Sequence, residues 1–501
     1  MAIKPRSVRV KSPATFESTN PATGEVVGVF PVFTKSEVED VVARAKVAAE
    51  RWANLSFRAR NVVLRDWAST LTRDMKEAAE LIHRETGKPL SDATLEVALA
   101  IEHIAWAGKF APRVLGRQSR PAGLLMFNMA AQVQRVPFGV VGVIGPWNYP
   151  IFTPVGSIAY ALAAGNAVVF KPSEFTPAIG AFLEESWKRI APFKDIFTTV
   201  TGDPATGVAL TESKVDKISF TGSTRTAKKV AAACAVNMTP VVLECGGKDA
   251  VLIDKDADIS KAAEMTLWHA MSNAGQSCIG AERVYVHRQV ADKFKAEIVS
   301  LAKEIKPGFG DGAKYGPATM PSQLKVIKSH IDDAVSKGGT FLLGGKDAIK
   351  GGYVDPVILA DVPEDSLAVT DETFGPTLVI NTVSNMDEAV DLANSTSYGL
   401  GAAVWSKKNG KRIASLLKCG MVSINSAFSF AAIGAVPFGG VKDSGYGRIH
   451  GAEGLLEFTY PRTVVKRRFR IPLEFTTFER SERADRILVR LVKLLHKRRI
   501  R

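Results

Sequence analysis

A cysteine and a glutamate about thirty residues apart carry the chemistry that this sequence most clearly predicts. The glutamate opens the segment Glu244-Cys-Gly-Gly-Lys248, and the cysteine closes the segment Asn273-Ala-Gly-Gln-Ser-Cys278. A cysteine thiolate attacks a carbonyl carbon readily. A nearby carboxylate can take a proton from water to break the resulting acyl-enzyme. Together the two side chains predict covalent catalysis through a thioester that water then hydrolyses.

Two further segments place polar side chains directly after short apolar runs that read as strands. Asn148 lies in Gly145-Pro-Trp-Asn-Tyr-Pro150, between two prolines that restrict the backbone. Its amide could donate to an oxyanion formed during attack on a carbonyl, or it could cap a turn. In Lys171-Pro-Ser-Glu174 the lysine and the carboxylate could hydrogen-bond the hydroxyls of a ribose, or they could form a solvated turn. The local sequence leaves both pairs of alternatives open.

A third segment, Phe220-Thr-Gly-Ser223, lies between a predicted strand and a predicted helix over 225–236. Glycine at this point permits a close approach to the backbone, and a helix N-terminus offers N–H donors to a phosphate. The segment lacks the Gly-x-Gly-x-x-Gly pattern of dinucleotide-binding turns. A phosphate site and an ordinary strand-to-helix turn therefore both remain open.

Strands alternate with helices over most of the chain, a pattern typical of wound parallel sheets. The first part reads as helices, and Ser36 is the predicted N-cap of the first one. Predicted helices span 35–50, 57–73, 75–86, 91–107, 154–164, 177–190, 204–213, 225–236, 262–272 and 289–305. Predicted strands span 132–136, 140–144, 167–170, 197–200, 217–220, 283–286, 377–381, 402–404 and 421–424. The expected fold class is α/β, with two wound parallel-sheet domains in one chain.

The composition is that of a globular protein with two or three domains. Of its 501 residues, 46% are hydrophobic and 23% are charged. Four cysteines without a Cys-x-x-Cys pair argue against a disulfide scaffold and against structural zinc, so we expect no metal. This cysteine usage suits a reducing, cytoplasmic setting, and the N-terminus lacks the apolar stretch of a signal peptide.

One uncharged stretch resembles a membrane span at first sight. No residue between Arg135 and Lys171 is charged. Four prolines interrupt the stretch, however, and would break a spanning helix repeatedly. We therefore expect buried strands and a helix of an α/β core at this place.

The formal charge of +14 is concentrated at the C-terminus, where residues 466–501 contain 13 Lys or Arg and 4 Asp or Glu. Since the rest of the chain carries little excess charge, nucleic acid is not an expected partner. From about Asp485 the tail has a helical pattern with two faces. The apolar face contains Ile487, Leu488, Leu491, Val492, Leu494 and Leu495, and the basic face contains Arg486, Arg490, Lys493, Lys497 and Arg501. Such a helix, over 484–501, could lie peripherally on an anionic membrane, or its leucine face could pack on the protein or on a second subunit.

Together these segments resemble the aldehyde dehydrogenase superfamily, and the resemblance runs from Asn20 to about Thr463. The matching segments are Pro146-Trp-Asn-Tyr-Pro150, Lys171-Pro-Ser-Glu174, Phe220-Thr-Gly-Ser223, Glu244-Cys-Gly-Gly-Lys248, Gly275-Gln-Ser-Cys278, Glu372-Thr-Phe-Gly-Pro376, Pro437-Phe-Gly-Gly440 and Ser444-Gly-Tyr-Gly-Arg448. Their number and their order along the chain make a chance resemblance negligible. The resemblance implies an NAD(P)-dependent, non-phosphorylating aldehyde dehydrogenase of the hydrolytic type, that is, an enzyme that releases its acyl group to water.

The resemblance also implies a role for each segment. Cys278 would be the nucleophile, Glu244 the base that activates water, and Asn148, with the backbone N–H of Cys278, the oxyanion hole. The cofactor would be NAD, with NADP as the alternative. The cofactor-binding residues would be Trp147, Lys171, Ser173, Glu174, Gly222, Ser223, Glu372 and Phe374. Cys245 stands where the family usually has leucine; we interpret it as a small buried apolar residue, with a redox partner of Cys278 as the alternative.

The same resemblance implies a domain organisation. A Rossmann-like NAD-binding domain would comprise 1–118 and 139–246, and a catalytic domain would comprise 247–452. Strands in 119–138 and 453–470 would join subunits into a homodimer or homotetramer, and 471–501 would form the basic tail.

The acyl acceptor and the substrate class can be narrowed further. The presence of Glu244 favours water over coenzyme A or phosphate as the acceptor. The segment 151–157, which follows Asn148, has no arginine that could pair with a substrate carboxylate. An apolar aldehyde, aliphatic or aromatic, is therefore favoured over a succinate-semialdehyde-type substrate. The alternative of another class is a non-catalytic protein that acts on a membrane or a partner through its basic tail.

Overall fold

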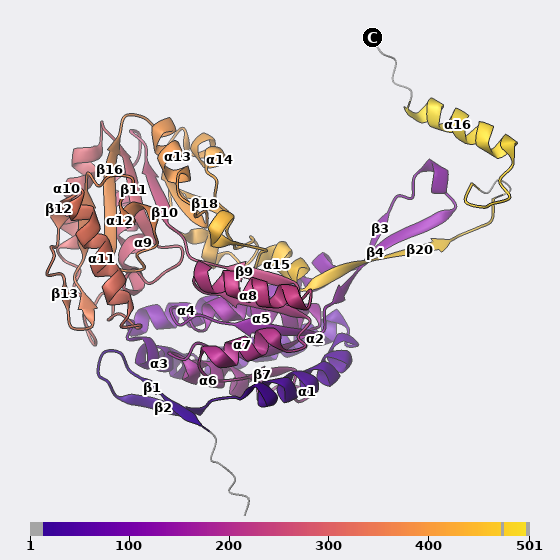
Figure 1. The fold of residues 1–501 in the computed structure, drawn as a ribbon, viewed down its shortest axis with the longest axis horizontal. Coiled ribbons are helices and arrows are strands. Elements are labelled where there is room, and N and C mark those ends of the chain that lie inside the picture. Colours follow the sequence, from indigo (N-terminus) through magenta and orange to yellow (C-terminus); the bar gives the residue numbers. More distant parts are fainter. Residues whose placement is uncertain (1–13, 472–474, 497–501) are drawn as a thin grey trace, which may run out of the picture. The chain divides into compact units, whose positions relative to one another are not determined.

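The computed structural model describes residues 14–471 and 475–496 (Figure 1). The chain divides into two compact units, Met1–Val114 with Pro137–Tyr460, and Leu115–Val136 with Pro461–Arg501. Both wound sheets belong to the first unit, so the predicted boundary at 246–247 between a cofactor domain and a catalytic domain stays a prediction. Residues 1–13, and Lys497 and Arg501 of the predicted tail helix, lie outside the described residues.

A six-stranded sheet forms the first wound layer. In spatial order its strands are β19 (Gly445–Tyr446), β9 (Val241–Glu244), β8 (Lys217–Thr221), β5 (Val140–Ile144), β6 (Ala167–Lys171) and β7 (Phe197–Thr199). All are parallel except β19, which is antiparallel to β9. The chain builds outward from β5 to β7 and then returns to β8 and β9, so the winding direction reverses between β5 and β8. Open α/β sheets bind ligands at such a reversal, outside the carboxyl ends of their strands.

Helices cover both faces of this sheet, as its apolar strands require. The helices of this part of the chain are α1 (Lys35–Ala53), α2 (Phe57–Arg73), α3 (Met75–Thr86), α4 (Leu90–Leu115), α5 (Phe152–Ala164), α6 (Pro177–Lys188), α7 (Pro204–Glu212) and α8 (Thr224–Val236). One face carries α1, α7 and α8, which pack around Val169, Ile218 and Phe220. The opposite face carries α5, where the Oγ of Ser157 lies 2.8 Å from the Oγ of Ser219.

A seven-stranded sheet forms the second wound layer. In spatial order its strands are β12 (Thr340–Leu343), β15 (Val357–Ala360), β16 (Thr377–Val383), β11 (Ala281–His287), β10 (Asp249–Ile253), β17 (Gly401–Trp405) and β18 (Met421–Ile424). Only β12 is antiparallel to its neighbour. This arrangement, with the wound sheet before it, confirms the predicted fold class.

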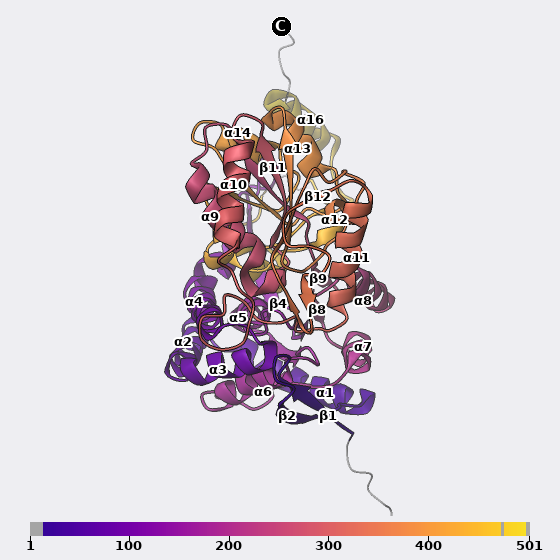
Figure 2. The same ribbon diagram turned by 90° about the vertical axis from the view of Figure 1, so that its left-hand side faces the viewer.

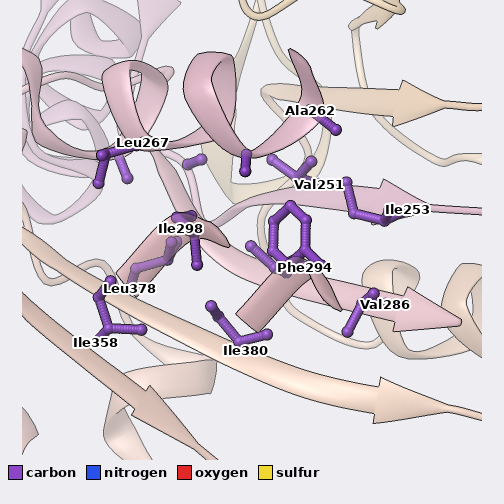
Figure 3. Packing of buried hydrophobic residues seen from close by; sticks show 14 of the residues in the cluster. Val251, Ile253, Ala262, Leu267, Val286, Phe294, Ile298, Ile358, Leu378 and Ile380 are labelled. Atoms are coloured by element: carbon purple, nitrogen blue, oxygen red, sulfur yellow. The ribbon is translucent and has the colours of Figure 1, made fainter. Parts of the chain in front are cut away.

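Helices again cover both faces of the second sheet (Figure 2). On one face lie α9 (Ile259–Met271) and α10 (Ala291–Ala302), and on the other lie α11 (Gln323–Ser336), α12 (Leu367–Thr370), α13 (Met386–Asn394) and α14 (Gly410–Leu416). Figure 3 shows Leu267 of α9 and Phe294 of α10 directed at strand residues such as Val251 and Ile380. This buried core fixes the chain on either side of the loop that contains Cys278.

The second unit contains a three-stranded sheet and a helix. In spatial order its strands are β20 (Thr459–Arg467), β4 (Met129–Pro137) and β3 (Gln118–Arg120). Arg462 donates a hydrogen bond to Gln134 across this sheet at 2.8 Å. The helix is α16 (Glu482–His496), and Asp485 in its first turn forms an ion pair with Arg480.

Several sequence predictions were wrong in detail. The N-cap of α1 is Thr34 rather than Ser36, because Thr34 and Glu37 form a reciprocal capping box. The chain begins with a hairpin, β1 (Thr15–Thr19) and β2 (Val26–Pro31), before the first helix. Helix α4 runs to Leu115, beyond the predicted end at 107. Residues 453–457, predicted as part of a strand, belong to α15 (Gly451–Glu457).

The uncharged stretch before Lys171 folds as expected into buried elements. It supplies β5, α5 and most of β6, all within the first unit. Across the described ranges, no helix is long and apolar enough to cross a membrane.

Candidate active site

The ends of four neighbouring strands gather most of the predicted site residues. Asn148 follows β5, Lys171 ends β6, Gly222 follows β8, and Glu244 ends β9. These strands are adjacent and parallel in the order β9, β8, β5, β6. Their carboxyl ends therefore meet at one edge of the sheet, at the point where the winding reverses.

Cys278 reaches this edge from the second sheet. It follows a tight 3₁₀ turn, η2 (Ser272–Gly275), in which Asn273 and Ala274 adopt left-handed backbone conformations. A Cβ at Gly275 would lie 2.1 Å from the backbone oxygen of Gly375, so only glycine fits there. The side-chain amide of Gln276 fixes the turn. It donates to the backbone oxygen of Asn273 at 3.0 Å and accepts from the backbone N–H of Thr319 at 2.9 Å. The motif around the cysteine is thus a rigid loop.

Two cavities meet at Cys278. The first, which we call the apolar cavity, has a volume of about 230 Å³ and is lined mainly by aliphatic and aromatic side chains. The second, which we call the polar cavity, has a volume of about 250 Å³. The apolar cavity is lined by Leu95, Leu99, Phe152, Met265, Trp268, Phe428 and Phe438, among others. The polar cavity is lined by Trp147, Asn148, Gly222, Ser223, Glu244, Glu372 and Phe374, among others. Cys278 lines both cavities, so a carbonyl group at its sulfur can face the polar cavity while its substituent occupies the apolar one.

The amide of Asn148 is held beside the cysteine loop. Its Nδ2 donates to the backbone oxygen of Gln276 at 2.9 Å. The Asn273 amide donates to the Asn148 backbone oxygen at 3.0 Å. Because an amide nitrogen carries two hydrogens, one donor of Asn148 remains for a ligand.

A buried ion pair that no sequence pattern indicated contacts the backbone carbonyl of Asn148. Lys88 Nζ lies 2.6 Å from the Glu96 carboxylate, and both side chains are 1% exposed. Lys88 also donates to the Asn148 backbone oxygen at 2.7 Å. The other Glu96 oxygen accepts from the backbone N–H groups of Ile151 and Phe152, at the start of α5. In the sequence, Lys88 stands out only as part of Gly87-Lys-Pro89, which interrupts the helical pattern.

Glu244 is a buried carboxylate without a hydrogen-bond partner. It is 2% exposed, and neither of its oxygens has a partner in the described structure. Desolvation raises its pKa well above the ordinary value, partly opposed by the positive charge of Arg448. A buried polar group left unpaired costs stability, so its presence at a cavity indicates a functional role. A carboxyl group with a raised pKa is also a stronger base once ionised.

The Cys278 thiol also titrates abnormally. Burial raises its pKa above the ordinary value, and the negative charges of Glu372, Asp249 and Glu244 raise it further. The same desolvation raises the pKa of Cys245 to about 12, with Glu244 as a second cause. Cys245 is 3% exposed and belongs to a hydrophobic cluster, which favours its interpretation as a small apolar residue.

Two predicted cofactor residues shape the polar cavity from the second sheet. The Glu372 carboxylate accepts from the Gly247 N–H at 3.1 Å, and burial raises its pKa to about 8. A Cβ at Gly246 would lie 2.2 Å from both Glu372 oxygens, so this glycine leaves room for the carboxylate. The Phe374 ring meets the Trp147 ring edge-on, with 5.5 Å between ring centroids.

Ser223 is the N-cap of the 13-residue helix α8, and its Oγ accepts from the Thr226 N–H at 3.4 Å. The helix N-terminus thus faces the polar cavity, as phosphate binding requires. Lys171, Ser173 and Glu174 do not line this cavity; they form their own cluster at the end of β6. Both Lys171 Nζ and Ser173 Oγ lie 3.4 Å from the Glu174 carboxylate.

The residues present fit a dinucleotide. A helix N-terminus and small residues suit a pyrophosphate, and the carboxylates of Glu174 and Glu372 suit ribose hydroxyls. A wound α/β fold with such a cavity beside a cysteine is typical of nucleotide-dependent oxidoreductases. The sequence model of the aldehyde dehydrogenase family matches residues 8–464, and the chain belongs to this family. It is an oxidoreductase that acts on aldehydes, with NAD or NADP as cofactor.

Individual relatives differ in the aldehyde that their names specify. The chain is 34% identical to a 4,4'-diapolycopene aldehyde oxidase of Methylomonas sp., over 93% of this chain and 88% of the relative. It is also 34% identical to a putative NADP⁺ succinate-semialdehyde dehydrogenase of Mycolicibacterium smegmatis, over 89% and 87%. A Staphylococcus aureus betaine aldehyde dehydrogenase solved with NAD⁺ is 29% identical, with a TM-score of 0.87 over 93% of this chain and 96% of that one.

Proposed function

We propose that this enzyme oxidises an apolar aldehyde to the carboxylic acid with NAD⁺, through a thioester on Cys278 that water hydrolyses. The observation that carries the proposal is the position of Cys278, which lines both the apolar and the polar cavity. A thiol at this junction can bond to the carbonyl carbon of an aldehyde whose substituent lies on the apolar side. The hydrogen on that carbon then faces the polar side.

Each candidate catalytic residue has its own step in the proposed reaction. The Cys278 thiolate adds to the carbonyl carbon and forms a thiohemiacetal. The free amide donor of Asn148 and the backbone N–H of Cys278 stabilise the oxyanion. Bound NAD(P)⁺ supplies the acceptor for the hydride that leaves the thiohemiacetal carbon. A thioester remains on Cys278, and Glu244 takes a proton from the water that hydrolyses it.

The lining of the apolar cavity supports an uncharged substrate. Among the described residues that line it there is no arginine, and its lysine, Lys88, is already paired with Glu96. A substrate carboxylate would therefore be desolvated beside Asp92 and Glu96 without a free counter-ion. This argues against the succinate-semialdehyde alternative.

Preference for NAD⁺ over NADP⁺ rests on Glu174. Its carboxylate, 35% exposed beside Lys171, can accept a hydrogen bond from a ribose 2′-hydroxyl. It would repel a 2′-phosphate.

A panel of aldehydes tests the proposal. NADH formation should follow addition of propanal, hexanal or benzaldehyde, with a kcat/KM at least tenfold above that for succinate semialdehyde. The same panel with NADP⁺ should give lower kcat/KM values throughout. Efficient oxidation of succinate semialdehyde, or equal efficiency with NADP⁺, would contradict the corresponding part.

The second unit supports a proposal about assembly and location. We propose that β3, β4 and β20 join subunits into a homodimer or homotetramer, and that the protein is cytoplasmic. Helix α16 then serves as a peripheral contact with anionic membrane. The observation in favour is that the C-terminal part of the apolar face of α16 is exposed, with Leu494 82% and Leu495 43% exposed, whereas Ile487, Leu488 and Leu491 are half-buried. The non-catalytic alternative has no support, because Cys278, Glu244 and Asn148 line one cavity and the chain belongs to a family of enzymes.

A further inference from the structure

The apolar cavity adjoins a second depression on the surface of the molecule. This depression is larger, with a volume of about 690 Å³, and we call it the outer groove. Four residues line both: Asp92, Met265, Trp268 and Ser272. The space in front of Cys278 therefore adjoins the outer groove along α9 and the start of α4.

An aromatic pair marks the junction. The Trp268 ring stacks on the Phe428 ring, with 4.7 Å between centroids and 25° between planes. Phe428 belongs to the apolar cavity alone, whereas Trp268 belongs to both spaces. Trp268 is nevertheless 43% exposed. Trp268 and Met265 line both spaces, so the exposed ring continues the apolar surface of the cavity into the groove, and a contiguous apolar surface of this kind indicates a ligand site.

The outer groove has an apolar floor and a charged rim. Met265, Leu301 and Ile305 supply aliphatic surface and are only partly buried. Lys261 and Glu264 stand at the rim and form an ion pair with each other at 2.8 Å. Asp92 and Lys314 also line the groove, so its charged side chains comprise two cations and two anions. The lining therefore selects no net charge, and the aliphatic floor favours hydrocarbon.

We propose that the outer groove is an extension of the substrate site and that the substrate is a long-chain aldehyde. Its carbonyl end reaches Cys278, its first carbons fill the apolar cavity, and the rest of its hydrocarbon chain passes Trp268 and lies on Met265, Leu301 and Ile305. This inference rests on the proposed function and adds the length of the substrate. Each methylene buried in the groove should raise kcat/KM by about threefold to fourfold.

Steady-state kinetics of the full-length enzyme with NAD⁺ test the inference. The substrates are propanal, which fits the apolar cavity, and hexadecanal delivered on cyclodextrin. Two variants alter the outer groove alone: Ile305→Glu places a charge on its floor, and Ala313→Trp fills it. A matched control, Val208→Glu, introduces the same charge on α7, where Val208 is 51% exposed and lines neither space.

Each groove variant should lower kcat/KM for hexadecanal at least tenfold, through KM, and change the value for propanal less than twofold. Val208→Glu should change neither. Equal effects on both aldehydes, or wild-type kinetics with hexadecanal in Ala313→Trp, would overturn the inference and leave the proposed function intact. If the wild-type enzyme oxidises neither aldehyde, the proposed function itself fails. Wild-type propanal turnover in either variant shows that it has folded, so a misfolded Ile305→Glu leaves Ala313→Trp to decide.

Discussion

At the scale of single residues, burial opposes the charges that the catalytic candidates must carry. Desolvation raises the pKa values of both the Cys278 thiol and the Glu244 carboxyl. A raised carboxyl pKa makes Glu244 a better proton acceptor, and a raised thiol pKa makes the thiolate a stronger nucleophile once it forms. Both effects serve a reaction in which protons move only when the substrate is in place.

Replacing the nucleophile tests the assignment most directly. We expect Cys278→Ala to abolish aldehyde oxidation, because no other cysteine in the described structure lies between the two cavities, while NADH binding measured by fluorescence is preserved. Cys419→Ala is the control and should keep normal turnover, since Cys419 lines neither cavity. Retention of a tenth of wild-type turnover in Cys278→Ala would refute the assignment.

Removing the base should separate the two halves of the reaction. In Glu244→Gln the thioester forms but water is not deprotonated, so a burst of NADH should precede a steady state that is roughly 10²–10⁴ times slower. Rapid-mixing absorbance measures the burst, and mass spectrometry of the Cys278 peptide detects the accumulated acyl group. Loss of the burst together with the steady state would place Glu244 in an earlier step.

The pH dependence of alkylation follows from the raised thiol pKa. Only the thiolate reacts with iodoacetamide, and below its pKa the thiolate fraction grows tenfold per pH unit. Alkylation of Cys278 in the cofactor-free enzyme should therefore still be rising steeply between pH 9 and pH 10, because burial raises the pKa above the ordinary value of 9.0. The same peptide in urea, followed by mass spectrometry, should reach half of its maximal rate near pH 9 and level off about one pH unit higher. A plateau below pH 8 in the folded enzyme would contradict the burial argument.

At the scale of elements, the important contact joins the start of α4 to the start of α5. Glu96 on α4 accepts two backbone N–H groups of the first turn of α5, where its negative charge also suits the helix dipole. Lys88, just before α4, ties this carboxylate to the Asn148 carbonyl. The backbone carbonyl of Asn148 is thus tied to the segment before α4, while its side-chain amide is held by the cysteine loop.

Separating this positioning from stability requires two variants. Lys88→Met should unfold more easily by roughly 3–5 kcal/mol, because it leaves Glu96 charged, buried and unpaired. Adding Glu96→Gln removes that charge and keeps an acceptor for the α5 amides, so stability should return. Turnover should stay about 10–100 times below wild type, with KM little changed, because the anchor of Asn148 is missing.

Denaturant unfolding and steady-state kinetics on the same samples provide both readouts. Wild-type turnover in the Lys88→Met and Glu96→Gln double variant would show that the pair serves stability alone.

At the scale of the whole molecule, two units carry different properties. The first contains both wound sheets and both cavities, and the second contains a small sheet and α16. The exposed side chains of Arg486, Arg490 and Lys493 on α16 would each contribute on the order of 1 kcal/mol near anionic lipid.

Removal of the tail should separate membrane binding from catalysis. The full-length protein should co-sediment with phosphatidylserine-containing vesicles at low salt and be released at high salt. A chain ending at residue 481 should not bind, yet it should oxidise propanal normally. A triple variant, Arg486→Glu, Arg490→Glu and Lys493→Glu, keeps the leucine face but reverses the charge of the basic face. It should therefore also fail to bind the vesicles.

Failure of the full-length protein to bind such vesicles would end the membrane proposal. A change in oligomeric state after truncation would instead indicate that the leucine face packs on a second subunit.

The sequence by itself determined the α/β class, the family and about half of the elements; strands β9 and β10 and helices α11–α14 were among those it did not predict. Strands such as β5 and β18 were predicted with their observed limits, because short apolar runs between turns leave few alternatives. The motifs around Glu244 and Cys278 were recognisable for a similar reason: their backbones need particular residues, as Gly275 illustrates. The hairpin β1–β2 was missed, because β1 is mostly polar and β2 is apolar without the alternation of a half-buried strand.

Only the tertiary structure decided which side chains share a site. Lys88 and Glu96 are ordinary charged residues in the sequence, and their role appears once α4 packs beside the turn that contains Asn148. The apolar cavity draws Leu95, Trp268 and Phe428 from three separate segments. Local patterns predict which face of an element is apolar, but the partner of that face depends on contacts between residues far apart in the chain. The length of the substrate site is therefore a property of the packing of α4, α9 and the loop of Phe428, which no single motif encodes.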